Sequence, residues 1–362
     1  MDQQEILVSS LFANYRKQVP PLYTKLCPSG NAPEPIFVNI TLNYVKLLSV
    51  NELEQTVDVI FEYDMYWNDA RLTWNPEEYS GIDGFFVNRK MVWRPDVLPY
   101  DCQSIADARD PDVQHVYVKH TGEISFYVTY VFTVVCPMNI QKFPFDRQSC
   151  EVNFVSFNFF DNELRLVCGL IESFNISYAS NGEWSVYDIT TDNSTLYSSG
   201  YGRQYDLVTV TLNIERSSTF YVVLIVIPSF ILTFLCVLGL FWSKFDHTDY
   251  LEKLGLGFAA ILAMCMVLEI AEESVPKTRQ LPSLSVYIMV NLLLITISIS
   301  IVVMGSKSSD ISCLFQSSGT SKNPKKYLFS FGLKFYKYLR FACLVLFPLA
   351  AVANLLVLVL DT

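Results

Sequence analysis

The stretch "CPMNIQKFPFDRQSC", Cys136 to Cys150, places thirteen residues between two cysteines, and at its centre lies Phe143-Pro144-Phe145-Asp146. The runs on either side, "GEISFYVTYVFTVV" and "SCEVNFVSFNFF", alternate apolar and polar residues as half-buried β-strands do. A disulfide across such a loop would contribute about 3 kcal/mol on the chain-entropy model. The stretch therefore predicts a stapled loop between two neighbouring strands.

Further strands lie on both sides of this loop in the sequence. "IFVNITLNYVKLL", "TVDVIFEYDMYW" and "YDLVTVTLNIE" show the same alternation and are bounded by Gly, Pro, Asn and Asp. Strands without intervening helical patterns are typical of an antiparallel sandwich. "EILVSSLFANYRKQVPP", Glu5 to Pro21, predicts a short amphipathic helix ended by two prolines. We expect residues 1–218 to form one domain.

The composition changes sharply after residue 218, where apolar runs dominate. Four runs approach the roughly 20 residues that cross a bilayer core. The predicted spans are 220–242, 253–273, 283–304 and 339–362, with a cytoplasmic loop and a juxtamembrane helix at 305–338. That loop is short and serine-rich, either naturally or because a linker replaces a longer one. The predicted fold is an extracellular antiparallel β-sandwich with an N-terminal helix, followed by a four-helix transmembrane bundle.

Basic residues predict the orientation of these spans, because cytoplasmic loops near membrane ends carry excess Lys and Arg. Between the third and fourth spans stand Lys307, Lys322, Lys325, Lys326, Lys334, Lys337 and Arg340, against one acid, Asp310. Both termini are then extracellular, in a multi-pass protein of the plasma membrane. The sequons at Asn39, Asn175 and Asn193 all precede the first span, where glycosylation is possible.

An extracellular domain meets an oxidising compartment, so its cysteines are candidates for disulfides. Cys136 with Cys150 is the best pair, Cys102 with Cys168 is a second candidate, and Cys27 is left without a predicted partner. The cysteines in or beside the spans are expected to be free thiols: Cys236, Cys265, Cys313 and Cys343. The chain begins without an apolar leader, as a mature form does.

Charge and motif content exclude several function classes. The formal net charge of −10 argues against nucleic acid as a partner and is compatible with cationic ligands or ions. No hydrolase, nucleotide or metal motif is present, and His115, His120 and His247 lack ligand spacing. We therefore expect no enzyme activity, no cofactor and no metal site.

The second span, within "DYLEKLGLGFAAILAMCMVLEIAEESVP", is unusual because charge in a membrane segment is costly unless it faces water or a partner. One helical face of this segment carries Glu252, Gly255, Ala259, Leu262, Met266, Glu269 and Glu273. One interpretation is a helix with charged ends, whose Glu269 pairs with another helix. The other is the pore-lining helix of a symmetric oligomer.

In the pore interpretation, acidic rings at both mouths concentrate cations and repel anions. Leu262 at mid-height forms a ring that closes the pore by dewetting. Gly255 and Ala259 leave the inner half wide, so the Glu252 ring is the narrow filter, and Glu269 adds a further acidic level.

The cysteine loop with "FPFD" and the acidic-ended second span together resemble the Cys-loop receptors, the pentameric ligand-gated ion channels. The resemblance covers nearly the whole chain. "WRPDVLPYD" is similar to the family's W-x-P-D segment, Trp67-Asn68-Asp69 to its W-x-D, and "YVVLIVIP", ending at Pro228, to the start of its first span. "LEKLGLG" and Pro276 resemble the cation-selective, nicotinic-receptor-like branch, since the Pro-Ala insertion of anion-selective members is absent.

The resemblance implies a pentamer of this chain with four further subunits, identical or different, in a lipid membrane. It also implies a small-molecule agonist between subunits, and permeant cations. One face of the agonist site would carry Tyr100, Phe157, Phe159, Tyr197 and Tyr205, and the facing subunit would contribute Glu62, Tyr63, Asp64 and Tyr127. Aromatic faces attract cations at roughly 0.5–2 kcal/mol each, which suits an amine.

Two departures from the family pattern leave the agonist open. Ser198-Ser199-Gly200 stands where nicotinic α-type subunits have adjacent cysteines, and Phe157 stands where many amine-binding members have Trp. Acetylcholine, another amine, a different small molecule, protons, or a subunit that binds no agonist all remain alternatives. An anion-selective member of the family and a membrane receptor without a pore are the other function classes.

The resemblance also implies how the domains are coupled. The tip residues Phe143, Pro144, Phe145 and Asp146 would rest on Val275, Pro276 and Lys277 after the second span. Arg216 would form a charge contact with Glu52 or Asp146. We expect Arg216→Ala to give a surface-expressed protein that does not open, and normal current from that variant would contradict this coupling.

Overall fold

The computed structural model describes residues 3–23, 34–200, 202–242, 250–273, 281–317 and 325–360. It divides the chain into two compact units, each with its own hydrophobic core. The strand unit comprises residues 1–138 and 147–215. The helix unit comprises residues 139–146 and 216–362. The tip of the cysteine loop therefore belongs to the helix unit, although the sequence places it between two strands.

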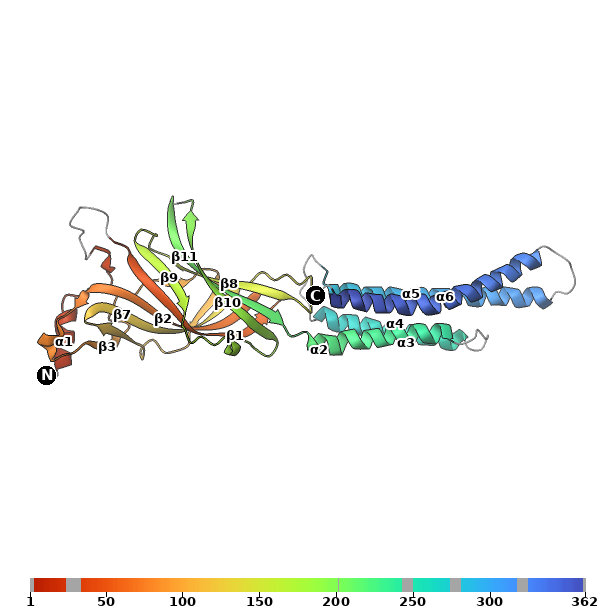
Figure 1. The fold of residues 1–362 in the computed structure, drawn as a ribbon, viewed down its shortest axis with the longest axis horizontal. Helices are drawn as coiled ribbons and strands as arrows, with labels where there is room; N and C mark the ends of the chain where they lie inside the picture. The colour runs from red at the N-terminus through yellow and green to blue at the C-terminus, as the bar shows by residue number, and fades with distance from the viewer. Residues whose placement is uncertain are drawn as a thin grey trace. The chain divides into compact units, whose positions relative to one another are not determined.

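The strand unit begins with a short helix, α1 (Gln3–Phe12), and continues as β-strands with short 3₁₀ turns between them (Figure 1). The strands are β1 (Ile36–Asn51), β2 (Thr56–Thr73), β3 (Gly84–Asn88), β4 (Val97–Pro99), β5 (Cys102–Asp107), β6 (His115–Lys119), β7 (Thr121–Val135), β8 (Arg147–Ser156), β9 (Leu164–Leu170), β10 (Trp184–Ser198) and β11 (Arg203–Arg216). The predicted N-terminal helix and β-sandwich are confirmed.

The strands form two sheets that face each other across the core. The larger sheet has the order β3-β6-β7-β2-β1-β9, with β5 also paired to β7, and the smaller sheet has the order β10-β11-β8-β4. Pairings such as β1–β2, β2–β7 and β8–β11 are antiparallel, as expected. One pairing differs from the prediction, because β1 and β9 run parallel. The chain reaches β9 from β8 in the other sheet, so no tight turn imposes an antiparallel partner.

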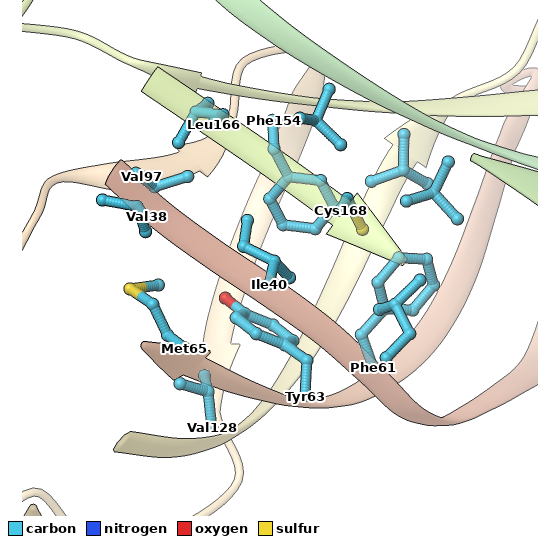
Figure 2. Close-up of a cluster of buried hydrophobic side chains, with 14 of the residues drawn as sticks. Val38, Ile40, Phe61, Tyr63, Met65, Val97, Val128, Phe154, Leu166 and Cys168 are labelled. Carbon is cyan, nitrogen blue, oxygen red and sulfur yellow. The ribbon is translucent and has the colours of Figure 1, made fainter. Parts of the chain in front are cut away.

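Alternation along β2 decides which side chains enter the core. Phe61, Tyr63 and Met65 are buried, whereas Glu62 and Asp64 lie on the opposite face of the sheet. Figure 2 shows Tyr63 within the core, among apolar side chains from neighbouring strands. The side-chain period of two, read from the sequence, therefore predicts the core of this strand correctly.

A buried charge network accounts for the W-x-D segment. The Asp69 carboxylate is fully buried and pairs with the Arg71 guanidinium at 2.7 Å. The Tyr15 hydroxyl donates to the same carboxylate at 2.9 Å and accepts from the Trp93 backbone N–H at 2.8 Å. This motif therefore ties the chain after α1 to β2 and to the start of the W-x-P-D segment.

Among the residues of the helix unit that the structure describes, four helical segments are long and apolar enough to cross a membrane: Thr219–Trp242, Leu251–Glu272, Ser283–Met304 and Tyr338–Leu360. The helices are α2 (Thr219–Tyr221), the π-helical turn η4 (Val222–Val226), α3 (Ile227–Trp242), α4 (Tyr250–Glu273), α5 (Ser283–Ser317) and α6 (Lys325–Leu360). The four predicted spans are confirmed as apolar helices. The predicted juxtamembrane helix and the last span form one continuous helix, α6.

Two contacts set how these helices pack. A Cβ atom on Gly257 of α4 would lie 2.6 Å from Cγ1 of Ile299 on α5, so only glycine allows this close approach. At the end of α3, the Arg340 guanidinium donates to the Phe241 carbonyl at 2.8 and 2.9 Å. Arg340 thus satisfies a helix C-terminal carbonyl that has no partner within its own helix.

Candidate functional site

The first group of predicted agonist residues lies at one end of the smaller sheet. Tyr100 follows β4 and Phe157 follows β8, and the Tyr100 backbone N–H donates to the Asn153 carbonyl at 2.9 Å. Both aromatic side chains are exposed. Strand pairing between β4 and β8 therefore brings two aromatic residues that are 57 positions apart to the same edge.

The Asp96 carboxylate of the W-x-P-D segment holds the loop that carries Phe157. It accepts hydrogen bonds from the Ser156 hydroxyl at 2.6 Å and from the backbone N–H groups of Phe157 and Asn158 at 3.1 and 2.9 Å. Hydrogen bonds to a charged acceptor are stronger than neutral ones. Asp96 therefore positions the second aromatic loop, a role that sequence analysis did not assign to it.

The β10–β11 hairpin carries the remaining predicted aromatics of this face. Tyr197 is exposed near its tip, where the Gly202 N–H donates to the Ser198 carbonyl at 2.9 Å. Tyr205 is half-buried and packs on Phe160 with ring centroids 4.9 Å apart. The loop after β8 and the start of β11 thus meet through aromatic contact.

Sequence analysis missed two residues at this contact, Phe160 and Arg203. The Arg203 guanidinium lies over the Phe160 ring, 4.5 Å from its centroid. The feature of the sequence that could have identified Phe160 is the aromatic run "FNFF", residues 157–160, which directly follows β8. Phe159, which was predicted to contact the agonist, is half-buried with its ring 6.0 Å from Trp93. Phe159 therefore packs on the W-x-P-D segment, which begins at Trp93.

The second group of predicted agonist residues lies on the outer face of the larger sheet. The Tyr127 hydroxyl donates to the Glu62 carboxylate at 2.5 Å, and the Arg109 guanidinium lies 4.9 Å from the centroid of the Tyr127 ring. Burial first, and then the hydrogen bond to Glu62, raise the pKa of Tyr127 to about 12. The Asp64 carboxylate accepts from the Asn43 amide at 2.7 Å.

Tyr63 does not belong to this group, and its prediction as an agonist contact is wrong. It lies between Glu62 and Asp64 on β2, so its side chain points to the opposite face of the sheet. There it is fully buried and packs on Phe154, with centroids 5.8 Å apart. A side chain in the sandwich core cannot reach an external ligand.

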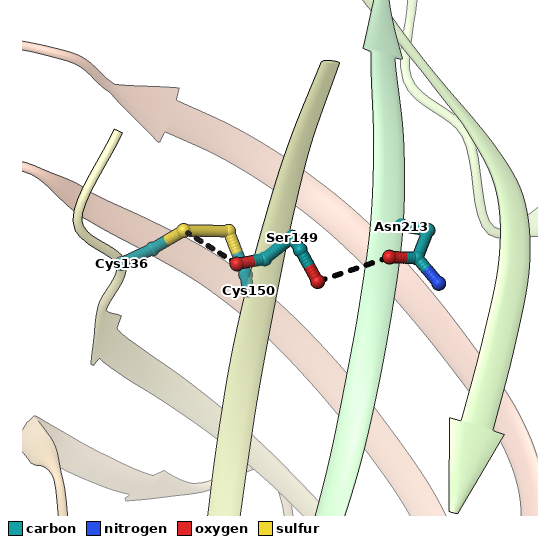
Figure 3. Close-up of a disulfide and its surroundings, with 4 residues drawn as sticks. All are labelled: Cys136, Ser149, Cys150 and Asn213. Atoms are coloured by element: carbon teal, nitrogen blue, oxygen red, sulfur yellow. Dashed lines mark hydrogen bonds between the residues drawn. A yellow bond between two sulfur atoms is a disulfide. The ribbon is translucent and has the colours of Figure 1, made fainter. Parts of the chain in front are cut away.

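The predicted disulfide between Cys136 and Cys150 is present, with the Cα atoms 5.1 Å apart (Figure 3). The prediction of a second bridge between Cys102 and Cys168 is wrong, since both are free thiols. Cys102 begins β5 and Cys168 lies in β9, and the sheet order places β7, β2 and β1 between these strands. Such a separation far exceeds the reach of a disulfide. Cys27 lies outside the described residues.

Within the helix unit, the loop 139–146 packs against the membrane helices. Ile140 and Phe143 are buried in the same core as Tyr221 and Ile225, and the Phe143 and Tyr221 rings meet edge to face at 4.8 Å. The Gln141 carbonyl accepts from both the backbone N–H and the hydroxyl of Ser283, at 2.8 and 2.7 Å. The loop therefore supplies an acceptor for the free N-terminal N–H of α5.

Arg216 pairs with Asp146 in this core. Its Nε lies 2.8 Å from Oδ1 and its Nη2 lies 3.4 Å from Oδ2. The side chains are 0% and 1% exposed, and the guanidinium lies 4.9 Å from the centroid of the Phe143 ring. Of the two partners expected for Arg216, the structure contains Asp146. Glu52 lies in the turn between β1 and β2, and its contact with Arg216 stays a prediction.

The exposed face of α4 carries the acidic stripe read from the sequence. Its exposed members are Glu252, Gly255, Ala259, Leu262, Met266 and Glu269. The opposite face is buried, at Lys253, Gly257, Ala260 and Met264. Phe258 and Cys265 are also exposed, so the open face is wider than the stripe alone. The Glu273 side chain, Val275, Pro276 and Lys277 lie outside what the structure describes.

Asn39, Asn175 and Asn193, the predicted glycosylation sites, are all exposed. Asn39 lies within β1 and Asn193 within β10, whereas Asn175 precedes the 3₁₀ turn Ile176–Tyr178. The Asn175 amide oxygen accepts from the Ser177 N–H at 3.0 Å. Each sequon is therefore open to solvent in the folded strand unit.

Comparison with known proteins agrees with this arrangement. Residues 4–218 match the family described as "Neurotransmitter-gated ion-channel ligand binding domain". The chain is 26% identical to bovine (Bos taurus) neuronal acetylcholine receptor subunit alpha-3, over 83% of this chain and 59% of that protein. It is 27% identical to rat (Rattus norvegicus) subunit alpha-6 over the same shares. It is 26% identical to trout (Oncorhynchus mykiss) subunit alpha-9-I, over 82% and 50%.

The chain thus spans between about half and three-fifths of the length of these relatives. The matched family region covers nearly all of the strand unit together with the loop 139–146, and the matches to these relatives, over about 300 residues, are longer than that region. Because the family match covers more than half of the chain, the chain belongs to the neurotransmitter-gated ion-channel family.

Proposed function

We propose that this chain is one subunit of a pentameric, neurotransmitter-gated cation channel in the plasma membrane. The observation that carries the proposal is the exposed acidic stripe of α4. A lone membrane helix facing lipid gains nothing from exposed Glu252 and Glu269, because charge in hydrocarbon is costly. Five copies arranged around an axis would turn these carboxylates towards water, where rings of acidic residues select cations.

The middle of the same face supplies the gate. Leu262 is 67% exposed and lies between the two acidic levels of α4. A ring of five leucines at this level would exclude water when the helices approach one another and admit it when they separate. Gly255 and Ala259, nearer Glu252, have small side chains that leave the inner half open.

Coupling runs through the cysteine loop. The disulfide holds both ends of the loop in the strand unit, while the loop tip is packed among α2, η4 and the start of α5. A displacement of the strands caused by agonist is then passed to the helices through Phe143 and the Arg216–Asp146 pair. Both termini are extracellular in this proposal, as the basic residues before the last span require.

The agonist site lies between subunits, because the two predicted groups occupy different sheets of one chain. Two aromatic faces, one beside the first group and one within the second, already carry the chain's own guanidinium groups: Arg203 lies over Phe160 and Arg109 over Tyr127. An amine would compete with those cations. We therefore expect an amine agonist to contact Tyr100, Phe157 and Tyr197, whose side chains are exposed.

Single-channel recording of Glu252→Gln tests the pore. The variant is expected to lower cation conductance and to move the reversal potential in a sodium chloride gradient towards chloride, because the ring loses its charge. Glu272→Gln is the matched control: Glu272 is an exposed glutamate of the same helix, outside the stripe. Equal conductance in the parent and Glu252→Gln would contradict the pore assignment.

The same recordings separate the alternatives. A reversal potential that follows chloride in the parent identifies an anion channel. Current evoked by acid alone identifies proton gating. A surface-expressed protein that never conducts, alone or with related subunits, identifies a receptor without a pore.

A further inference from the structure

A hollow of about 480 Å³ lies in the strand unit, lined in part by the β10–β11 hairpin that also carries Tyr197 and Tyr205. The predicted agonist residues themselves are not among its lining residues. Its floor includes Phe37 of β1 and Val167 of β9, and its wall includes Asn193 and Thr195 of β10. None of these residues except Asn193 entered the functional assignment above.

Strand register explains why an aromatic side chain lies in its floor. The parallel β1–β9 ladder pairs Phe37 with Arg165 and Asn39 with Val167. Residues two apart on a strand share a face, so these four side chains lie on the outer face of the larger sheet. Phe37 is 58% exposed, which is unusual for a phenylalanine beside a packed core. The floor therefore presents an aromatic side chain that is more than half exposed.

Charged groups are held at the side of the hollow. The Asp206 carboxylate accepts from the Leu166 backbone N–H at 3.0 Å and from the Arg165 guanidinium at 3.2 Å. Both Arg165 and Asp206 line the hollow. An exposed aromatic ring beside fixed hydrogen-bonding groups matches a sugar ring, which has one C–H face and several hydroxyl groups.

We propose that this hollow seats the inner sugars of an N-linked glycan on Asn193. The sequon Asn193-Ser194-Thr195 forms part of the wall, so a sugar attached there begins at the edge of the hollow. Phe37 then stacks on the C–H face of the sugar, and Arg165 and Asp206 bind its hydroxyl groups. The inference rests on the extracellular placement of this unit in the proposed function.

The modification itself is ordinary group transfer from a lipid-linked sugar pyrophosphate. The Asn193 amide nitrogen forms a bond to the anomeric carbon of the sugar, the bond from that carbon to the pyrophosphate oxygen breaks, and the amide loses one proton. The hollow acts after this step, by holding the product.

The test is the rate at which a peptide N-glycosidase releases the Asn193 glycan from the native, full-length protein made in glycosylating cells. Phe37→Ala keeps the sequon and removes the floor, so release is expected to be about 2- to 10-fold faster, the range of one aromatic contact. Phe86→Ala is the matched control, because Phe86, on β3, is also an exposed phenylalanine, 65% against 58% for Phe37. It is expected to leave the rate unchanged.

Mass spectrometry of all three sequons separates the possible failures. Sugar at Asn39 or Asn175 but not at Asn193 would overturn the proposed glycan site in the hollow and leave the extracellular placement of the strand unit intact. Sugar at none of them would overturn the extracellular placement together with the seat. Sugar at Asn193 with equal release rates in the parent and Phe37→Ala would overturn the role of the hollow alone.

Discussion

Removing the Arg216 guanidinium is expected to destabilise the helix unit, because its partner is buried with it. The two side chains are 0% and 1% exposed, so Arg216→Ala leaves the Asp146 carboxylate without its cation in the core. Breaking a buried pair in this way costs about 3–5 kcal/mol. Total stability is often only about 5–15 kcal/mol, so the loss is a large share of it. Because the pair is buried, we now expect Arg216→Ala to lower the amount of protein at the cell surface, in place of a surface-expressed channel that does not open.

The measurement is thermal unfolding of the detergent-solubilised protein, with surface biotinylation on intact cells. Arg216→Met and Asp146→Leu are compared singly and together, because apolar replacement of both partners removes the stranded charge. The double variant is expected to be more stable than the sum of the single losses predicts, by about 2 kcal/mol. Current recordings from the double variant that reaches the cell surface then test whether the Arg216–Asp146 pair is also needed for channel opening.

A matched pair is available as a control one residue away. Arg147 and Glu215 form an ion pair at 3.3 Å, with side chains 66% and 45% exposed. An exposed pair contributes about 0–1 kcal/mol, so the melting temperature of Arg147→Ala is expected to lie close to that of the parent protein. Equal losses for Arg147→Ala and Arg216→Ala, or strict additivity in the Arg216–Asp146 cycle, would refute the reasoning from burial.

Three further predictions follow from the strand unit. Asp96→Ala is expected to raise the agonist concentration for half-maximal current about tenfold, because Phe157 loses its anchor, and an unchanged dose-response curve would contradict this. Burial raises the pKa of the Cys168 thiol to about 12, so alkylation at pH 8 is expected to spare it in the native protein. Unfolding without reductant should then label both Cys168 and Cys102, and a disulfide-linked peptide pair would refute the free thiols. Burial acts to raise the pKa of Asp107, but hydrogen bonds from Arg109, Gln114 and Arg89 outweigh it and lower that pKa. The stabilisation is thus present above the ordinary Asp pKa of about 4 and lost as pH falls through the lowered value. The difference in melting temperature between the parent and Asp107→Asn should shrink below pH 4, and growth on acidification would contradict the assignment.

Local patterns account for the parts of the site that sequence analysis placed correctly. The spacing of Cys136 and Cys150 between two alternating runs was enough to predict their disulfide. The period of α4 was enough to put Glu252 and Leu262 on one exposed face. Each of these features depends on residues that are close in the chain.

Errors arose where the position of a residue depends on strand phase or on sheet order. The family resemblance implied Tyr63 as an agonist contact together with Glu62 and Asp64, yet alternation along β2 sends its ring into the core. Cys102 and Cys168 were a second candidate pair among the extracellular cysteines, and three intervening strands separate them. The burial of Tyr63 follows from the alternation along β2, whereas the separation of the two cysteines depends on which strands pair.

The sequence by itself determined the two-part architecture, the disulfide loop, the four apolar helices and the acidic face of α4, since hydropathy and spacing are local properties of the chain. Only the tertiary structure decided that the loop tip packs with the helices and that Arg216 meets Asp146, 70 positions away. It also decided that Phe37 and Asn193 line one hollow. Such contacts depend on how strands and helices that are distant in the sequence pack together, and no short sequence pattern encodes that packing.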